Sequence, residues 1–155
     1  MNIQSAQAHH ALALSDLAMR SKAHWGYDQT FLQQVKDELT YHPEDCLNHP
    51  TFVATEGDQL LGFYQLIRLV DQRYELEAMF VEPAHMGQGI GRQLFQHLAR
   101  LCVTLGVSEV VIQADPYAEG FYLNEGCVRV GSRPSGSIPG RELPVLLFKV
   151  PSANI

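Results

Sequence analysis

Apolar residues recur along the chain at two spacings, and both predict regular secondary structure. Apolar positions three and four residues apart predict helices over residues 31–42 and 90–105, and residues 10–25 also read as a helix. A short helix is predicted over residues 115–126 from its ends: Asp115 as N-cap, Pro116 at the first helical position and Gly126 just past the end. In the helix over residues 90–105 the apolar stripe includes Leu94, Leu98 and Leu101, and Gly106 follows it as a C-cap. Asp28 is predicted to cap the start of the helix over residues 31–42.

Alternating or continuous apolar runs predict the strands. They cover residues 3–6, 51–55, 59–70, 73–81, 109–114, 127–131 and 143–150. A hairpin turn is predicted at residues 56–58, and loops are predicted around Pro43 and Pro50 and over the Gly/Pro/Ser-rich residues 132–144. The order β-αα-βββ-α-β-α-ββ predicts an α/β fold with a mixed central sheet of about seven strands and flanking helices. We expect residues 1–155 to form a single domain.

Residues 85–92 read HMGQGIGR, with glycine at positions 87, 89 and 91, just before a predicted helix. Free N–H groups at a helix start, with no Cβ in the way, form an anion site. A P-loop is excluded, because Arg92 and Gln93 stand where that motif needs Lys and Ser or Thr. The dinucleotide motif GxGxxG would need glycine in place of Arg92. An anion site and a tight turn without a ligand therefore remain open.

Composition narrows the class of protein. The net charge of −6, with 11 Lys and Arg in total, argues against nucleic acid or an anionic membrane as a partner. Cys46, Cys102 and Cys127 are far apart and form no CxxC pair, so a reducing cytoplasm is expected. The N-terminus lacks the features of a signal peptide. No metal site is expected, because the adjacent His9 and His10 cannot share one helix face.

Two segments resemble a known family. MFVEPAHMGQGIGRQLFQHL resembles the acetyl-CoA motif of the GCN5-related N-acetyltransferase (GNAT) superfamily, and ADPYAEGFYLNEGCVRVG resembles its second motif. The order of elements fits nearly the whole chain, and SIPGR resembles a stretch in a subgroup of small bacterial acetyltransferases. The resemblance implies the GNAT fold, acetyl-CoA as cosubstrate and direct attack by an amine. It also implies a possible homodimer, for which the last two strands offer edges.

The resemblance assigns coenzyme-binding roles to particular positions. The backbone of Met79, Phe80 and Val81 would pair with the pantetheine arm as an added strand. Backbone amides would hold the pyrophosphate, aided by the helix dipole, at Gly87, Gln88, Gly89, Ile90, Gly91 and Arg92. Asp115 stands where the family usually has Asn; it either contacts the pantetheine or only caps its helix.

Two residues are candidates for the chemistry. Tyr122 matches the family's tyrosine beside the coenzyme sulfur, and a phenol can donate its proton to a leaving thiolate. Glu77 lies two residues before the pantetheine-pairing segment and is a candidate general base; the alternative is an ordinary surface or ion-paired strand residue. His85 is a second candidate base, although loop histidines are often only exposed.

The acceptor site is expected at two places. Trp25 and Tyr27 lie at a helix junction together with the cations Arg20 and Lys22, although Trp25 could instead fill the core and the cations could be solvated. Ser137 and Arg141 lie in the 132–144 loop, which is predicted to move as a lid over a small amine. The leading hypothesis is an acetyl-CoA-dependent N-acetyltransferase; the alternatives are a noncatalytic acyl-CoA sensor and, more remotely, a nucleotide-binding regulator.

Overall fold

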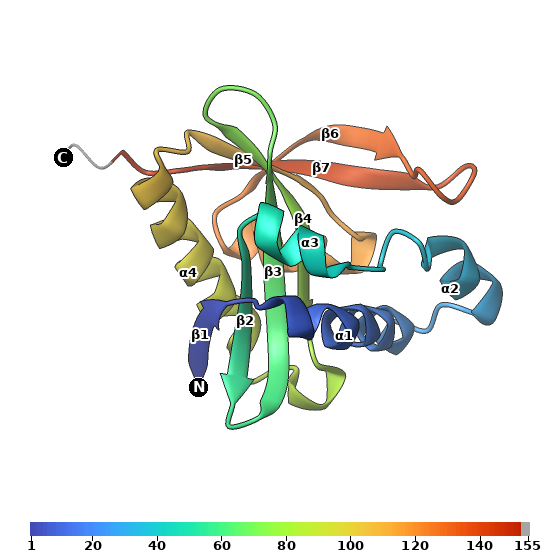
Figure 1. Cartoon of the computed structure of the whole chain (residues 1–155). Helices are drawn as coiled ribbons and strands as arrows, with labels where there is room; N and C mark the ends of the chain where they lie inside the picture. The colour runs from blue at the N-terminus through green and yellow to red at the C-terminus, as the bar shows by residue number, and fades with distance from the viewer. Residues whose placement is uncertain (153–155) are drawn as a thin grey trace. The chain divides into compact units, whose positions relative to one another are not determined.

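The computed structural model describes residues 1–152 of the chain. Seven strands form one hydrogen-bonded sheet in the order β1-β2-β3-β4-β5-β7-β6, and α-helices follow β1, β4 and β5 along the chain (Figure 1). The chain divides into two compact units. The first contains Met1–Leu66 and Ala78–Leu94, and the second contains Ile67–Glu77 and the chain from Phe95 onward. The mixed α/β architecture predicted from the sequence is confirmed, whereas the single domain stays a prediction.

The elements have the following bounds. The strands are β1 Asn2–Ser5, β2 Thr51–Glu56, β3 Gln59–Arg68, β4 Arg73–Val81, β5 Glu109–Gln113, β6 Val128–Pro134 and β7 Glu142–Lys149. The α-helices are α1 Ala11–His24, α2 Gln29–Val35, α3 Pro43–Asn48, α4 Ile90–Leu105 and α5 Glu119–Asn124. Three short 3₁₀ helices are η1 Ala8–His10, η2 Pro83–His85 and η3 Pro116–Ala118.

In the first unit β1, β2 and β3 pair antiparallel, with the helices α1, α2 and α3 between β1 and β2 along the chain. The predicted hairpin turn joins β2 to β3, where Glu56 pairs with Gln59 and Gly57 has a φ of 60°. Its core includes the fully buried side chains of Leu14, Leu17 and Phe63. This apolar interior anchors α1, whose exposed side carries Asp16 and Arg20 together with Leu12, which is 73% exposed.

Gly62, in the middle of β3, allows a close contact between this strand and the start of α4. A Cβ at Gly62 would lie 2.8 Å from the carbonyl oxygen of Phe80 and 3.0 Å from a methyl carbon of Leu94. Both distances are too short for a real side-chain carbon. The missing side chain thus lets the first turns of α4 and the end of β4 approach β3, a role that the sequence analysis did not identify.

The second unit is built on β5. The start of β4 pairs with it in parallel, Arg73 opposite Glu109, and β7 pairs with it antiparallel along its whole length. β6 and β7 form a long hairpin (Figure 1). Aromatic rings pack around Phe95, whose ring centroid lies 5.0 Å from that of Phe148 and 6.3 Å from that of Phe121. This parallel strand pair followed by an antiparallel one makes the sheet mixed, as expected.

The predicted helix over residues 31–42 is wrong at its C-terminal end. Asp28 caps α2 as expected, because its carboxylate accepts the amide of Phe31 at 2.8 Å. The helix nevertheless ends at Val35, since the amide of Lys36 bonds the carbonyl of Gln33, three residues back, and tighter turns follow. The predicted loop at Pro43 is also wrong, because Pro43 opens the short helix α3.

The predicted long loop over residues 132–144 is wrong as well. β6 continues to Pro134, which pairs with Glu142 of β7, so only residues 135–141 connect the two strands. Proline and serine misled the prediction, since an edge strand tolerates proline where a central strand does not. The connection is a turn with its own hydrogen bonds: the amide of Ser135 donates to the carbonyl of Arg141 at 2.7 Å.

Candidate active site

The glycine turn, residues 86–92, leaves a row of backbone donors without protein acceptors. Gly87 and Gly89 have φ angles of 83° and 81°, which residues other than glycine rarely adopt. Met86 before them donates to the carbonyl of Pro83, and Gln93 after them donates to the carbonyl of Gly89. Among the described residues, the amides of residues 87–92 have no such acceptor. Residues 90–92 form the first turn of α4, and this turn holds no acidic residue.

This turn has the properties of an anion site. A Cβ at Gly87 or Gly89 would meet no protein atom within 4 Å, so the positive φ, and not crowding by the protein, requires glycine at both positions. The unpaired amides and the positive end of the helix dipole favour a negatively charged group such as a phosphate.

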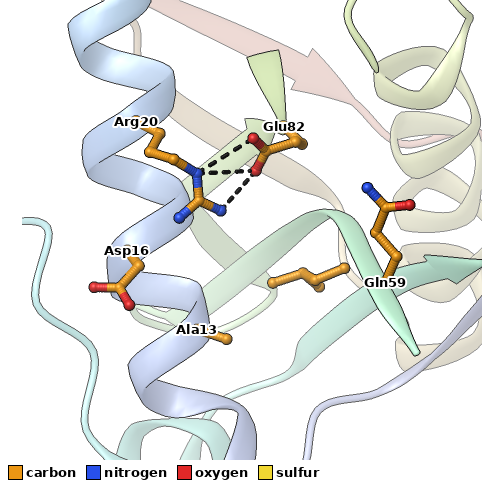
Figure 2. Close-up of a pocket in the computed structure, with 6 residues that line it drawn as sticks. Ala13, Asp16, Arg20, Gln59 and Glu82 are labelled. Atoms are coloured by element: carbon orange, nitrogen blue, oxygen red, sulfur yellow. Dashed lines mark hydrogen bonds and ion pairs between the residues drawn. The ribbon is translucent and has the colours of Figure 1, made fainter. Parts of the chain in front are cut away.

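An ion pair borders the turn on the side of α1. Arg20 Nη2 lies 2.6 Å from Glu82 Oε2, and Arg20 Nε lies 3.2 Å from both carboxylate oxygens (Figure 2). The pair lines a cavity of about 330 Å³, which is also bounded by Ala13, Asp16, Gln59 and Leu60. Sequence reasoning left Arg20 between an acceptor contact and a solvated helix end, and no pattern pointed to a partner 62 positions away.

His85 is held between two glutamine side chains. Its Nε2 lies 3.0 Å from Nε2 of Gln59, and its Nδ1 lies 3.3 Å from Oε1 of Gln88. An amide nitrogen cannot accept a hydrogen bond, so the contacts require Nε2 of the ring to accept and Nδ1 to donate. Both ring nitrogens are therefore engaged, which favours a structural role for His85 over that of a free base.

The last residues of β4 carry the predicted pantetheine-pairing segment. The ladder with β5 covers Arg73 to Glu75, and Met79, Phe80 and Val81 come after it along the strand. Glu77 lies between these two parts of β4 and is exposed. The predicted alternation holds in this strand, since Leu76 and Ala78 are buried on either side of Glu77.

Tyr122 lies in α5 and is buried, with 6% of its surface exposed. Burial raises the pKa of its phenol well above the ordinary value, and the nearby Cys127 and Asp115 raise that pKa further. The thiol of Cys127 is itself kept neutral, because burial and the charge of Glu125 raise its pKa to about 12. The phenol of Tyr122 is thus a protonated group across the neutral pH range.

Asp115 caps the helical turn before α5 and also forms an ion pair. One carboxylate oxygen accepts the amide of Tyr117 at 2.9 Å, and the other lies 3.2 Å from Arg141 Nη2. The capping role considered from the sequence is confirmed by this geometry. The side chains of Asp115 and Arg141 are only 9% and 16% exposed, so the pair joins the turn after β6 to the end of β5 inside the second unit.

The other predicted acceptor residues lie in two different settings. Trp25 follows α1 and is 37% exposed, so it does not fill the core, and Tyr27 stacks on Phe31 with 3.8 Å between ring centroids. Ser137 belongs to the turn over residues 135–141, where its amide donates to Ser135 Oγ. Its own hydroxyl oxygen is buried without a hydrogen-bond partner among the described residues.

The structure thus distributes the predicted site residues over the two units. The first unit holds Trp25, Tyr27, Met79, Phe80, Val81, Gly87, Gln88, Gly89, Ile90, Gly91 and Arg92, and the second holds Glu77, Asp115, Tyr122, Ser137 and Arg141. Within the described chain, no group of His, Cys, Asp or Glu is placed to hold a metal ion. Helices able to span a bilayer are absent from the same residues.

Comparison with solved structures identifies the fold. The PaiA N-acetyltransferase from Thermoplasma acidophilum, in complex with coenzyme A, is 16% identical and superposes with a TM-score of 0.73, covering 96% of this chain and 98% of that one. YncA from Salmonella typhimurium with acetyl-CoA is 20% identical, with a TM-score of 0.70 and coverage of 100% and 96%. An aminoglycoside 6'-N-acetyltransferase complexed with coenzyme A is 19% identical, with a TM-score of 0.70 and coverage of 97% and 98%.

Sequence comparison identifies the family. No curated protein shows significant sequence similarity to the chain. The family model described as "Acetyltransferase (GNAT) domain" matches residues 8–136, which include the glycine turn, Tyr122 and most of both units. Together with the fold and the unpaired amides ahead of α4, this match shows that the chain belongs to the GNAT acetyltransferase family.

Proposed function

We propose that the protein is an acetyl-CoA-dependent N-acetyltransferase that transfers the acetyl group directly to an amine. One observation carries this proposal beyond family membership: the amides of residues 87–92 have no acceptor among the described residues and stand at the start of α4. Two phosphate groups of a coenzyme A pyrophosphate match such a row of donors. The coenzyme A in the PaiA structure and the acetyl-CoA in the YncA structure support the same ligand.

The backbone of β4 would hold the rest of the coenzyme. In this proposal Met79, Phe80 and Val81 offer main-chain donors and acceptors to the amides of the pantetheine arm. Because side chains alternate along a strand, this pairing uses the backbone and leaves the side chains free to pack. Asp115 has its two oxygens engaged with Tyr117 and Arg141, so its role is to shape the end of β5.

Acetyl-CoA supplies the acyl group as a thioester, which is cleaved between carbon and sulfur. The attacking amine nitrogen forms the new bond to the acyl carbon while the sulfur leaves as a thiolate. Tyr122 is proposed to give its phenolic proton to that thiolate. Its raised pKa keeps the phenol protonated at neutral pH and at the same time makes it a weaker acid toward the thiolate. Glu77 is proposed to accept the proton that the amine must lose.

The proposed acceptor is a small amine. Trp25 and Tyr27, next to the end of α1, offer aromatic surface, and Ser137 offers a buried hydroxyl without a partner among the described residues. A cytoplasmic location belongs to the same proposal, since the three free, buried thiols suit a reducing compartment.

Substitution of Tyr122 by phenylalanine tests this proposal against a noncatalytic acyl-CoA sensor. In a screen of amines, monitored by thiol release from acetyl-CoA, Tyr122→Phe should lower kcat by about 100-fold. The same variant should bind coenzyme A with unchanged Kd. Because the pKa of Tyr122 is raised, the wild-type rate should not fall between about pH 8 and pH 10 through loss of this proton.

Tyr117→Phe is the matched control, because Tyr117 lies five positions before Tyr122, is 59% exposed and should affect neither rate nor affinity. Coenzyme binding without thiol release for any amine tested would support the sensor. Equal rates for wild-type protein and Tyr122→Phe would remove Tyr122 from the mechanism.

A further inference from the structure

The glycine turn is attached to the rest of its unit through two side chains that lie outside the sequence motif, Arg20 of α1 and Gln59 of β3. We propose that Arg20 of α1 and Glu82, which follows β4, are positioning residues that hold this turn in the conformation that binds the coenzyme. This inference rests on the proposed function, because it concerns the same coenzyme site. It adds to that site a helix residue 62 positions before its partner.

The contact between the two side chains is close and bidentate. Arg20 uses both Nε and Nη2, and Glu82 accepts with both carboxylate oxygens (Figure 2). The carboxylate is only 16% exposed, whereas the Arg20 side chain is 52% exposed. Glu82 also raises the pKa of Arg20, chiefly through their hydrogen bond. A carboxylate so little hydrated needs its partner, and without it would turn toward water.

A movement of the Glu82 side chain would also shift the glycine turn, because the backbone of Glu82 is hydrogen-bonded on both sides. Its amide donates to the carbonyl of Leu61 in β3 at 2.8 Å, and its carbonyl accepts the amide of His85 at 2.9 Å. The 3₁₀ turn η2 starts at the next residue, and Met86 then donates back to Pro83. Only this one helical turn separates Glu82 from Gly87, so the direction in which the free amides point depends on where Glu82 is held.

A second set of side chains holds the middle of the same segment. Gln59, the first residue of β3, contacts His85, and His85 in turn contacts Gln88 between the two positive-φ glycines. The segment is therefore held at its start by α1 and farther along by β3. Gln59 and the Arg20–Glu82 pair also line the same cavity of about 330 Å³ (Figure 2).

The consequence is preorganisation. Among the described residues, the amides of residues 87–92 make no hydrogen bond within the protein and two of these residues are positive-φ glycines, so contacts from outside the turn help to keep it in one conformation. If loss of the ion pair lowered the fraction of binding-competent turn to about one fifth, the apparent Kd for coenzyme would rise about fivefold. The chemical step, once coenzyme is bound, would be little changed.

Titration calorimetry with coenzyme A tests the proposal in Arg20→Gln, Glu82→Gln and the double variant. Each single change should raise Kd about fivefold, and the double variant should be no worse than either, because the two changes break one interaction. Exchanging the charges in Arg20→Glu/Glu82→Arg should restore much of the affinity. At saturating acetyl-CoA, kcat should stay within about twofold of wild type while KM rises.

Arg73→Gln is the control, because Arg73, 45% exposed, pairs with Glu109 at 3.4 Å at the opposite end of β4 and should leave Kd unchanged. If Arg20 instead bound the coenzyme directly, Glu82→Gln would not weaken binding and the charge exchange would weaken it further; that result would overturn the proposal. If Kd were unchanged in all variants, only the positioning role of Arg20 and Glu82 would be overturned. If the wild-type protein did not bind coenzyme A, the proposed function would be overturned as well.

Discussion

Two turns of this protein contain glycine at the same backbone angle, but they differ in whether their backbone amides donate hydrogen bonds within the protein. Gly89, ahead of α4, and Gly140, between β6 and β7, both have a φ of 81°, and a Cβ at either would meet nothing within 4 Å. Among the described residues, the amides around Gly89 have no protein acceptor. The amides around Gly140 are largely used, since Ser135 Oγ accepts those of Ser137 and Ile138.

The difference shows that glycine content does not by itself identify a ligand site. A positive φ is needed in both turns, one to reverse a hairpin and the other to turn the chain into a long helix. What separates them is whether the turn supplies acceptors for its own donors. Residues 135–141 do so, and Arg141 further joins them to Asp115. The turn before α4 is held from outside, by Glu82 and His85, and leaves its amides for a ligand.

The largest expected effect separates the two turns directly. Gly89→Val should raise the Kd for coenzyme A by about 100-fold or more, because the branched side chain disfavours the left-handed backbone and occupies the space beside the amides. Gly140→Val places the same strain in the other turn, at a similar cost of roughly 1–2 kcal/mol in stability. Its coenzyme affinity should match that of wild type. Calorimetric titration and urea denaturation of both variants measure the two quantities, and equal Kd values for the two would contradict the comparison.

An intermediate effect is expected for Glu77, which should change rate and not affinity. Glu77→Gln should lower kcat by about tenfold or more at neutral pH, since an amide cannot accept the amine proton. The deficit should shrink as the pH rises and the amine acceptor loses its proton unaided. Glu75→Gln, two residues earlier on the same face of β4, serves as the control. A pH–rate profile identical to that of wild type would exclude Glu77 as the base.

The smallest expected effect concerns Arg141. Arg141→Gln removes the ion pair to Asp115 and should lower the free energy of unfolding by about 1 kcal/mol, at the upper end for ion pairs because both side chains are mostly buried. Coenzyme affinity and the KM for the amine should both stay unchanged if Arg141 only stabilises its turn. A large rise in amine KM at unchanged stability would instead assign Arg141 to the acceptor site.

Much of the fold could be predicted because its strongest patterns also have clear ends. β4 and α4 occupy residues 73–81 and 90–105, as predicted, since Pro83 stops the strand and Gly106 stops the helix. Weak patterns failed: Pro43, read as a loop residue, opens α3, although Asp45 in its first turn was a usable indication of a helix start. The end of the edge strand β6 was missed because residues 132–134, Ser-Arg-Pro, are exposed and include no apolar side chain of a typical strand.

The candidate site was predictable only where a local motif describes it. The glycine turn and Tyr122 belong to short segments with family character, so the sequence pointed to them. The Arg20–Glu82 and Arg141–Asp115 pairs join residues 62 and 26 positions apart, and a single sequence contains no pattern that links such distant charges. In both pairs the arginine contacts a carboxylate of the protein, whereas the sequence alone also allowed it to bind the acceptor.

The central claim is that the free amides before α4 bind coenzyme A, and a thermal-shift titration of the wild-type protein tests it most directly. Acetyl-CoA and coenzyme A should each raise Tm, and the rise should level off as the ligand concentration increases. At a ligand concentration of 100 times Kd, the free energy of unfolding should have increased by about 2.7 kcal/mol. ATP, which lacks the pantetheine arm that β4 is proposed to bind, should give little or no shift at the same concentrations. No shift with either coenzyme form, or an equal shift with ATP, would contradict the account.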